Sequence, residues 1–203
     1  MKIFLATTNG GKIERLTKLL KQINVDIEVY TPADLHIEIP EIVETGKSLL
    51  ENAKTKARAY FGKVQMPILA NDTGFYVEGE GFIDAPKREA LGEASEGTLS
   101  LEEISKKMAD FWKGIAIKHG GKVDASWIES FVVLYQDGTM KEAESRRDVV
   151  LTNQEFGTPH VQMPVRALYY SKVTNKPAIQ HTKEEEIQEM KPIIDALVNV
   201  LEY

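Results

Sequence analysis

The sequence predicts an α/β protein that combines a mostly parallel β-sheet unit with a partly antiparallel lobe. Residues 2–30 read as a strand, a helix and a strand, an order that is typical of parallel pairing. Two later strand-like runs flank Gln136-Asp137-Gly138, which is a strong hairpin signal. The 203 residues suffice for one globular domain, and no linker rich in Pro, Gly or Ser divides them.

Composition excludes several classes of function. The chain has no cysteine, so disulfides, thiolate catalysis and cysteine-based metal sites are excluded. The net charge of −6 disfavours a broad nucleic-acid-binding surface. The first apolar run is too short for a signal peptide or a membrane span, so we expect a cytoplasmic protein without a membrane partner. The four histidines are not spaced for a metal site.

The first elements follow from apolar spacing. A buried strand is expected over Lys2–Thr7, followed by a turn at Gly10-Gly11. Apolar residues then recur at helical spacing from Ile13 to Ile23. Asp26–Tyr30 alternates between polar and apolar residues, which indicates the second strand.

The stretch Phe4–Lys12 is a candidate phosphate-binding turn. Its strand ends in small and polar residues, and two glycines and a lysine precede the helix. Backbone N–H groups at a helix N-terminus and the helix dipole both favour anions, and Lys12 adds a positive charge. The alternative is an ordinary strand–helix turn with a solvated lysine, because the stretch matches neither G-x-G-x-x-G nor the Walker A pattern.

A second helix is expected to begin after Ser48 and to run to Phe61, because Ser48 and Glu51 have the spacing of a capping box. Glu44 lies just before this helix. An acid at this place can favour the helix dipole, or it can point into a cleft as a metal ligand. Position alone leaves both interpretations open.

Another acid follows the short apolar strand Pro67–Ala70. The segment Asn71-Asp72-Thr73-Gly74 comes next, and Phe75–Val77 resumes strand character. Asp72 can be a ligand group at the end of a buried strand, or the segment can be a plain β-turn. Together with Glu44 and the glycine turn, Asp72 provides the two carboxylates and the phosphate site that Mg²⁺-assisted phosphoryl chemistry needs.

The middle of the chain is expected to contain a loop with a short helix over Glu78–Gly97 and a long helix over Leu101–His119. Lys87 and Arg88 in the loop are either ordinary solvated charges or contacts for a substrate phosphate. Strand patterns follow in three further runs, which are Trp127–Tyr135, Thr139–Glu144 and Asp148–Leu151.

The last part of the chain contains an apolar run and a closing helix. Pro164–Tyr170 is apolar with Arg166 inside it, and apolar residues recur at helical spacing over Lys183–Leu201. Proline lacks a backbone N–H and clashes with the preceding turn of a helix. We therefore expect Pro192 to break or kink the closing helix near Lys191.

Three segments resemble motifs of the inosine/xanthosine triphosphate pyrophosphatase family. Ala6–Lys12 resembles the family pattern A-T-x-N-x-x-K. Glu44-Thr-Gly46 with Glu51–Ala57 resembles E-T-G followed by E-N-A and K-A, and Ala70–Gly74 resembles D-D-S-G. The motifs occur in the family's order and at about its spacing, over roughly the first 80 residues.

The resemblance implies a fold and a reaction. The fold would be an elongated, two-lobed mixed sheet with flanking helices and a central cleft, built from one domain over residues 1–203. The assembly would be a homodimer. The reaction would be Mg²⁺-dependent hydrolysis of a nucleoside triphosphate to a monophosphate and pyrophosphate. Family substrates are purine nucleotides with deaminated or otherwise damaged bases, which the enzymes remove from the nucleotide pool.

The resemblance also assigns roles to residues. Glu44 and Asp72 would bind Mg²⁺, and Asp72 would also act as the general base. Lys12 would stabilise charge on the phosphates, and Thr73 would contact the substrate. The triphosphate would be held by the residues at the first motif, which are Thr7, Thr8, Asn9, Gly10, Gly11 and Lys12.

The chain departs from the family pattern mainly in its second half. Asn71 replaces the first acid of the third motif. The base-reading F-G-Y-D-P pattern is expected near residue 160, where the chain has His160-Val-Gln-Met-Pro164, and the S-H-R triplet is absent from Glu186–Lys191. Arg166 and Lys191 are candidates to replace lost contacts. The reaction type therefore transfers better than the base that is recognised.

Three functions fit these residues. The first is a pyrophosphatase for non-canonical purine nucleoside triphosphates, and the second is the same chemistry on a different nucleotide. The third is a non-catalytic nucleotide-binding module, which the loss of the acid at Asn71 motivates. Retention of Glu44 and Asp72 favours the two enzymes.

Overall fold

The computed structural model describes residues 1–40, 48–83, 86–92, 99–160 and 163–201. Its helices are α1 (Gly10–Ile23), α2 (Leu49–Tyr60), α3 (Pro86–Leu91), α4 (Leu101–Lys118) and α5 (Lys183–Leu201). Its strands are β1 (Lys2–Leu5), β2 (Glu28–Tyr30), β3 (Ile68–Val77), β4 (Gly81–Phe82), β5 (Lys122–Leu134), β6 (Met140–Thr152) and β7 (Tyr169–Ser171). Short 3₁₀ turns cover Pro164–Ala167 and Ala178–Gln180.

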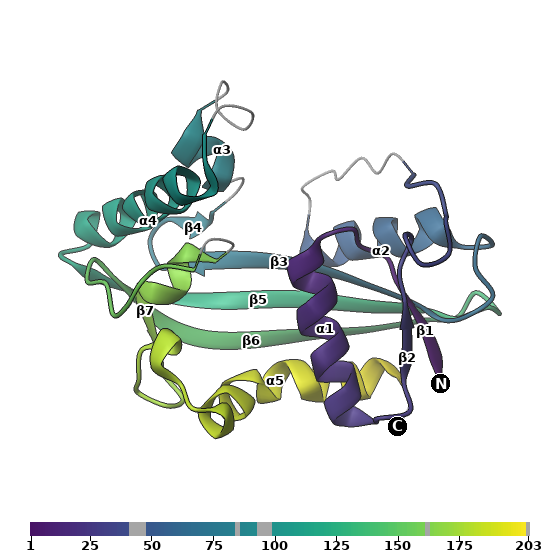
Figure 1. The fold of residues 1–203 in the computed structure, drawn as a ribbon. Coiled ribbons are helices and arrows are strands. Elements are labelled where there is room, and N and C mark those ends of the chain that lie inside the picture. Colours follow the sequence, from purple (N-terminus) through teal and green to yellow (C-terminus); the bar gives the residue numbers. More distant parts are fainter. Residues whose placement is uncertain (41–47, 84–85, 93–98, 161–162, 202–203) are drawn as a thin grey trace. The chain divides into compact units, whose positions relative to one another are not determined.

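These strands form one seven-stranded mixed sheet with flanking helices, which confirms the predicted α/β class (Figure 1). The strand order is β2-β1-β3-β5-β6-β7, and β4 pairs with β3. Strand β1 pairs in parallel with β2 and β3, as the strand–helix–strand order at the start of the chain predicts. The β3–β4 and β6–β7 pairs are antiparallel, so the partly antiparallel region is also confirmed.

The chain divides into two compact units, which we describe separately. Unit 1 consists of Met1–Thr73, Ile128–Arg146 and Pro192–Tyr203. Unit 2 consists of Gly74–Trp127 and Arg147–Lys191. Across the described residues, we find no helix that combines the length and the hydropathy of a membrane span.

In unit 1, α2 packs on one face of the sheet. Its Ala53, Ala57 and Tyr60 belong to the same buried cluster as Phe4 of β1, and the Phe4 and Tyr60 rings lie 5.0 Å apart. Successive side chains of a strand point to opposite faces, so Ile3 points to the other face, where it is also fully buried. Helix α1, which crosses in front of the strands in Figure 1, is an amphipathic helix that buries its leucines.

In unit 2, α4 supplies the main helical contribution to the core. Trp112 of α4 and Phe75 of β3 pack edge to face with their ring centroids 5.2 Å apart. The helix begins with a full capping box: Ser100 and Glu103 each accept a hydrogen bond from the other's backbone N–H. This cap fixes the first turn of α4, which lies wholly within unit 2.

The N-terminus of α1 differs from the prediction. Gly10 and Gly11 do not form a turn; they are the first two residues of the helix, and Asn9 is its N-cap. The reason is local, since the Asn9 side chain accepts the backbone N–H of Lys12 and so satisfies a donor that the helix leaves unpaired. At the second helix the Ser48 cap is confirmed, with its hydroxyl accepting from the Glu51 N–H.

The predicted interruption at Asn71–Gly74 is wrong, because β3 runs without a break from Ile68 to Val77. Polar residues that favour turns stay in the strand here because their side chains find partners inside the fold: Asn71 Nδ2 lies 3.3 Å from the Ser130 carbonyl of β5. Similarly, the two separate strand patterns at 139–151 form the single long strand β6.

Of the predicted break or kink near Lys191, the break is wrong, and the kink stays a prediction. Helix α5 continues from Lys183 to Leu201 with Pro192 inside it. Burial offsets the missing backbone hydrogen bond, because Ile193 and Leu197 on the following turn are fully buried.

Tyr169 of β7 gives a stability prediction. Burial raises the pKa of Tyr169 to about 12, and nearby Glu189 acts in the same direction. The neutral phenol is favoured in the folded state, so its contribution to stability is complete below pH 10 and is lost as the pH rises through 12. Between these values the unfolding free energy should fall by about 3 kcal/mol more in the wild type than in Tyr169→Phe, measured by urea denaturation. Equal pH dependence of the two proteins would contradict this account.

Candidate active site

The N-terminus of α1 offers unpaired backbone donors. Asn9 Oδ1 accepts from the Lys12 N–H at 3.0 Å, and the Asn9 N–H in turn donates to Thr7 Oγ1 at 3.2 Å. Within the described residues, the N–H groups of Gly10 and Gly11 have no hydrogen-bond partner. With the helix dipole, these donors suit an anion such as a phosphate group.

Asp72 of β3 is held by two side chains of α2. Lys56 Nζ donates to Asp72 Oδ1 at 2.6 Å, and Asn52 Nδ2 donates to Asp72 Oδ2 at 3.1 Å. Asn52 and Lys56 are four residues apart and therefore share one face of the helix. Asp72 is 7 % exposed, so its carboxylate is fixed in orientation at a nearly buried position.

A second carboxylate lies on the opposite face of the sheet. Glu129 of β5 has no exposed side-chain surface, and Arg15 of α1 binds both of its oxygens, at 2.7 and 2.5 Å. Asn71 Nδ2 and Thr73 Oγ1, which flank Asp72 in β3, each lie 3.4 Å from Glu129 Oε2. Since side chains alternate along β3, Asp72 faces α2 while these two neighbours face Glu129.

Lys12 connects the helix N-terminus to β3. Its Nζ donates to the Asn71 carbonyl at 3.5 Å. Burial lowers the pKa of Lys12, the positive charge of Lys56 lowers it further, and Asp72 and Glu129 oppose the shift. Lys56, Asp72 and Glu129 therefore all lie within electrostatic range of Lys12.

Among the residues that the structure describes, and so without Glu44, the site carries more positive than negative side chains. Lys12, Arg15 and Lys56 contribute three positive charges against two from Asp72 and Glu129, which leaves a formal excess of one. The free N–H groups of α1 add to this excess. Such a site can bind a polyanion and present Asp72 to it as a proton acceptor or metal ligand.

The donor set near Asp72 suits a hard divalent cation. Asn52 Oδ1 is buried and has no hydrogen-bond partner in the part of the chain that the structure describes. It is an uncommitted oxygen beside a carboxylate, and Mg²⁺ prefers oxygen ligands of these two types. The described residues contain no group of three or more acidic or histidine side chains placed for a metal, and Glu44, the other predicted ligand, lies outside them.

The structure brings together most of the predicted residues that it describes. Thr7 to Lys12 line the start of α1, with Thr8 exposed, and Asp72 and Thr73 lie in β3 of the same unit. Arg166 and Lys191 belong to unit 2. There, Arg166 Nη2 lies 3.2 Å from the Ala178 carbonyl and 3.4 Å from Glu186 Oε1. Their roles in substrate binding stay predictions.

Sequence reasoning missed four residues of this site: Arg15, Asn52, Lys56 and Glu129. Asn52 and Lys56 could have been found, because they lie in the helical E-N-A-K-T-K-A segment at a spacing of four. Glu129 also left a signal, since it is the only acid in the apolar run from Trp127 to Tyr135. Its pairing with Arg15, 114 residues away, has no sequence signal.

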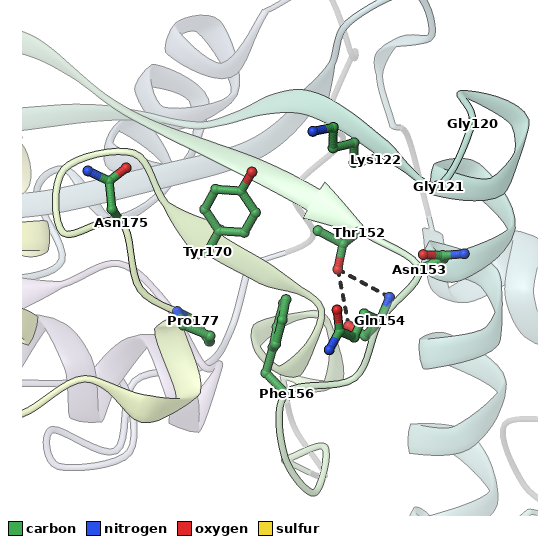
Figure 2. Close-up of a pocket in the computed structure, with 10 residues that line it drawn as sticks. All are labelled: Gly120, Gly121, Lys122, Thr152, Asn153, Gln154, Phe156, Tyr170, Asn175 and Pro177. Atoms are coloured by element: carbon green, nitrogen blue, oxygen red, sulfur yellow. Dashed lines mark hydrogen bonds between the residues drawn. The ribbon is translucent and has the colours of Figure 1, made fainter.

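Unit 2 contains an open pocket that none of the predicted site residues lines. Its volume is about 540 Å³. The Phe156 and Tyr170 side chains lie on the wall, and Thr152 Oγ1 accepts from the Gln154 N–H at 3.2 Å (Figure 2). The remaining lining residues are Gly120, Gly121, Lys122, Asn153, Asn175 and Pro177.

The fold and the site define a class of protein: an α/β protein in which a helix N-terminus with unpaired backbone donors accompanies a nearly buried carboxylate in a mixed sheet. Comparison with known proteins identifies the family. Residues 3–120, more than half of the chain, match the model of the Ham1 family, so the chain belongs to the Ham1 family.

Relatives of known name support this membership. The dITP/XTP pyrophosphatase of Yersinia pseudotuberculosis is 29% identical over 97% of this chain and 98% of its own. That of Lactobacillus acidophilus is 30% identical over 64% of this chain and 68% of its own. The match to the dITP/XTP pyrophosphatase of Aquifex aeolicus is 44% identical but spans only 36% of that protein and 38% of this chain.

Solved structures show the same fold. The Staphylococcus aureus Ham1 protein superposes with a TM-score of 0.68 over 97% of this chain and 96% of its own, at 20% identity. The nucleoside-triphosphatase / dITP/XTP pyrophosphatase from Mycobacterium abscessus gives a TM-score of 0.69 at 18% identity and covers 98% of both chains. The fold of this chain is therefore that of Ham1 proteins.

The Arg15–Glu129 pair gives a prediction for stability. Removing one partner of a buried ion pair leaves an uncompensated charge, so Arg15→Met should lower the unfolding free energy by about 3 kcal/mol. The double variant Arg15→Met/Glu129→Gln removes both charges and should be more stable than the single variant. Lys54→Met is the control, because the described partners of Lys54 are the exposed Glu51 and Glu142 and its loss should change the denaturation midpoint little. A double variant less stable than Arg15→Met would contradict the assignment.

Proposed function

We propose that this protein is a metal-dependent nucleoside triphosphate pyrophosphatase that releases pyrophosphate and a nucleoside monophosphate. The observation that carries the proposal is the group formed by Lys12, Lys56 and Asp72 beside the free N–H groups of α1. A carboxylate fixed among cations and open backbone donors suits hydrolysis of a phosphate chain. Membership of the Ham1 family and relatives named dITP/XTP pyrophosphatase support it.

Each side chain has a separate task in this proposal. The N–H groups of Gly10 and Gly11 and the Lys12 ammonium bind the phosphate oxygens and stabilise the negative charge that develops on them. Asp72 orients the attacking water and accepts its proton. Asn52 and Lys56 keep the Asp72 carboxylate in one orientation, since each donates to a different oxygen.

We infer Mg²⁺ as the metal. When bound, it would neutralise charge on the triphosphate and lower the barrier to attack at phosphorus. The chain's own ligands would be Asp72, the free Asn52 Oδ1 and Glu44. Asp72 and Asn52 lie close enough to hydrogen bond, so one ion could be reached by both side chains, directly or through water.

The substrate we propose is a non-canonical purine nucleoside triphosphate, as the names of the relatives indicate for those proteins. The phosphate-binding residues are described and lie in unit 1. The segment expected to read the base, near His160 to Pro164, departs from the family pattern, and its residues 161–162 lie outside the described ones. A nucleotide with a different base is therefore the second candidate substrate.

Pyrophosphate release from a nucleotide panel tests the proposal. With Mg²⁺ present, the wild type should cleave dITP and XTP faster than ATP or GTP. Asp72→Asn should lower turnover at least about 100-fold, because the amide cannot accept the proton of water. Lys54→Met, at a residue of the same helix that pairs with Glu51 and Glu142, should keep wild-type turnover.

The outcomes separate the candidate functions. Cleavage of another nucleotide in preference to dITP and XTP would keep the chemistry and change the substrate. Nucleotide binding without release from any member of the panel would indicate a binding module. An Asp72→Asn variant that turns over at the wild-type rate would falsify the mechanism.

Metal removal gives an independent prediction. Because the proposed ligands are carboxylate and amide oxygens, a chelator should abolish pyrophosphate release, and excess Mg²⁺ or Mn²⁺ should restore it. The measurement is turnover in chelator-treated protein as a function of added metal. Full activity in metal-free buffer would exclude the role assigned to Asp72 and Asn52 as ligands.

Three broader expectations remain proposals. We expect the protein to act in the cytoplasm and to form a homodimer. We also expect the chain to be a single domain whose two lobes border the active-site cleft. Sedimentation equilibrium of the full chain at several concentrations would measure the dimer directly. A monomer throughout the micromolar range would remove the homodimer from this proposal.

A further inference from the structure

Among the described residues of unit 1, Glu129 is the most deeply buried carboxylate, and no step proposed above uses it. Its side chain has no exposed surface, although an ionised carboxylate in this environment loses favourable hydration. Arg15 supplies the compensating charge through two parallel hydrogen bonds to the two oxygens. A buried pair of this kind adds little stability compared with apolar residues of equal volume, so its presence calls for another reason.

The contacts of Glu129 connect the two halves of the proposed site. Arg15 lies one turn after Lys12 on α1, the helix whose N-terminus offers the phosphate donors. On β3, Asn71 and Thr73 both lie 3.4 Å from Glu129 Oε2, and Asp72 stands between them. One carboxylate thus contacts the phosphate-binding helix and both neighbours of the proposed general base.

Strand geometry explains how this contact can act on Asp72. Asn71 and Thr73 point to the face of Glu129, and Asp72 points to the opposite face, where Lys56 and Asn52 hold it. Fixing the two flanking side chains therefore fixes the backbone of Asp72 from the side that α2 does not reach. Thr73 Oγ1 also lies 3.1 Å from Asn71 Oδ1, so the two flanking residues are tied to each other.

We propose that Glu129 is a positioning residue for the pyrophosphatase reaction: paired with Arg15, it holds the phosphate-binding start of α1 and the Asp72 segment of β3 in register. In this role Glu129 acts through other residues and not on the substrate or the metal, because its side chain has no exposed surface. This inference rests on the proposed function. It adds that the reaction depends on a carboxylate on the face of the sheet opposite to Asp72.

Two isosteric substitutions can move the carboxylate from residue 129 to residue 71, because these two side chains face each other. In Glu129→Gln the charge at residue 129 is lost, and in Asn71→Asp a second carboxylate faces Glu129 across 3.4 Å. The double variant Asn71→Asp/Glu129→Gln restores one carboxylate to this face and reverses the hydrogen bond between the two residues. Total charge and side-chain volume then equal those of the wild type.

The positioning role predicts a specific pattern of rates. Glu129→Gln should lower kcat about 10- to 100-fold and raise KM by a smaller factor, as expected when a supporting hydrogen bond is lost. Asn71→Asp should also lower kcat, because it brings like charges together. The double variant should recover kcat at least tenfold above the lower of the two single variants. Glu142→Gln is the control, since Glu142 is exposed and pairs only with Lys54.

Other outcomes overturn the inference. If Glu129→Gln keeps the wild-type kcat and only the melting temperature falls, the pair is a structural element alone. If kcat of the double variant falls by the product of the two single-variant factors, then catalysis does not depend on a carboxylate on this face of the sheet. Should Glu129→Gln fail to fold, Arg15→Lys tests the same point. It keeps the charge and removes the two-pronged contact, so kcat should fall several-fold with KM maintained.

A binding measurement separates this inference from the proposed function. Calorimetric titration with inorganic pyrophosphate and Mg²⁺ reports the register of α1 and β3 without any turnover. Glu129→Gln should weaken this binding, and the double variant should restore it. Absence of pyrophosphate release from the wild type, with this binding pattern intact, would reject the reaction and keep the positioning role. Unchanged binding and kcat in Glu129→Gln would reject the positioning role and keep the reaction.

Discussion

The continuity of β3 through Asn71-Asp72-Thr73 is the constraint on which the site depends. In an extended strand neighbouring side chains must point to opposite faces. Asp72 therefore faces α2, and its neighbours face α1 and Glu129. A turn at this place would have released all three side chains to solvent, and neither helix could then have positioned the carboxylate. The same strand pairs with β1, whose end leads into the start of α1, the proposed phosphate-binding element.

Burial makes the charges of the site interdependent. Lys56 and Asp72 are 14 % and 10 % exposed at the side chain, and Glu129 is fully buried. In such surroundings a charge without a partner is costly, whereas a charge with a partner is held in one geometry. The lowered pKa of Lys12 follows from the same crowding, because burial and neighbouring cations both disfavour its protonated form. A polyanion entering this site would relieve the excess of positive charge.

Much of the fold was predictable because its signals are local. The apolar spacing of α1 and α4 and the turn at Gln136-Asp137-Gly138 depend on neighbours in the sequence. The errors came from long-range contacts that override local preference. Asn71 and Thr73 favour turns, yet contacts with Ser130 and Glu129 keep them in β3. The motifs located Lys12 and Asp72, but the partners of Asp72 and the Arg15–Glu129 pair required the folded chain.

Unit 2 shows why the reaction and the recognised base are separate questions. Glu189 lies in the segment where the family resemblance predicts an S-H-R triplet, and its side chain is 1 % exposed. Its oxygens face inward: Arg147 Nη1 lies 3.3 Å from Oε1, and His181 Nδ1 lies 2.9 Å from Oε2. Groups that read a base must present donors or acceptors to it, whereas these three side chains face one another inside the unit. Replacing the triplet has thus produced a buried polar contact between α5 and β6 within this unit. Under the proposed function, selection of the base would then use other polar groups of the chain.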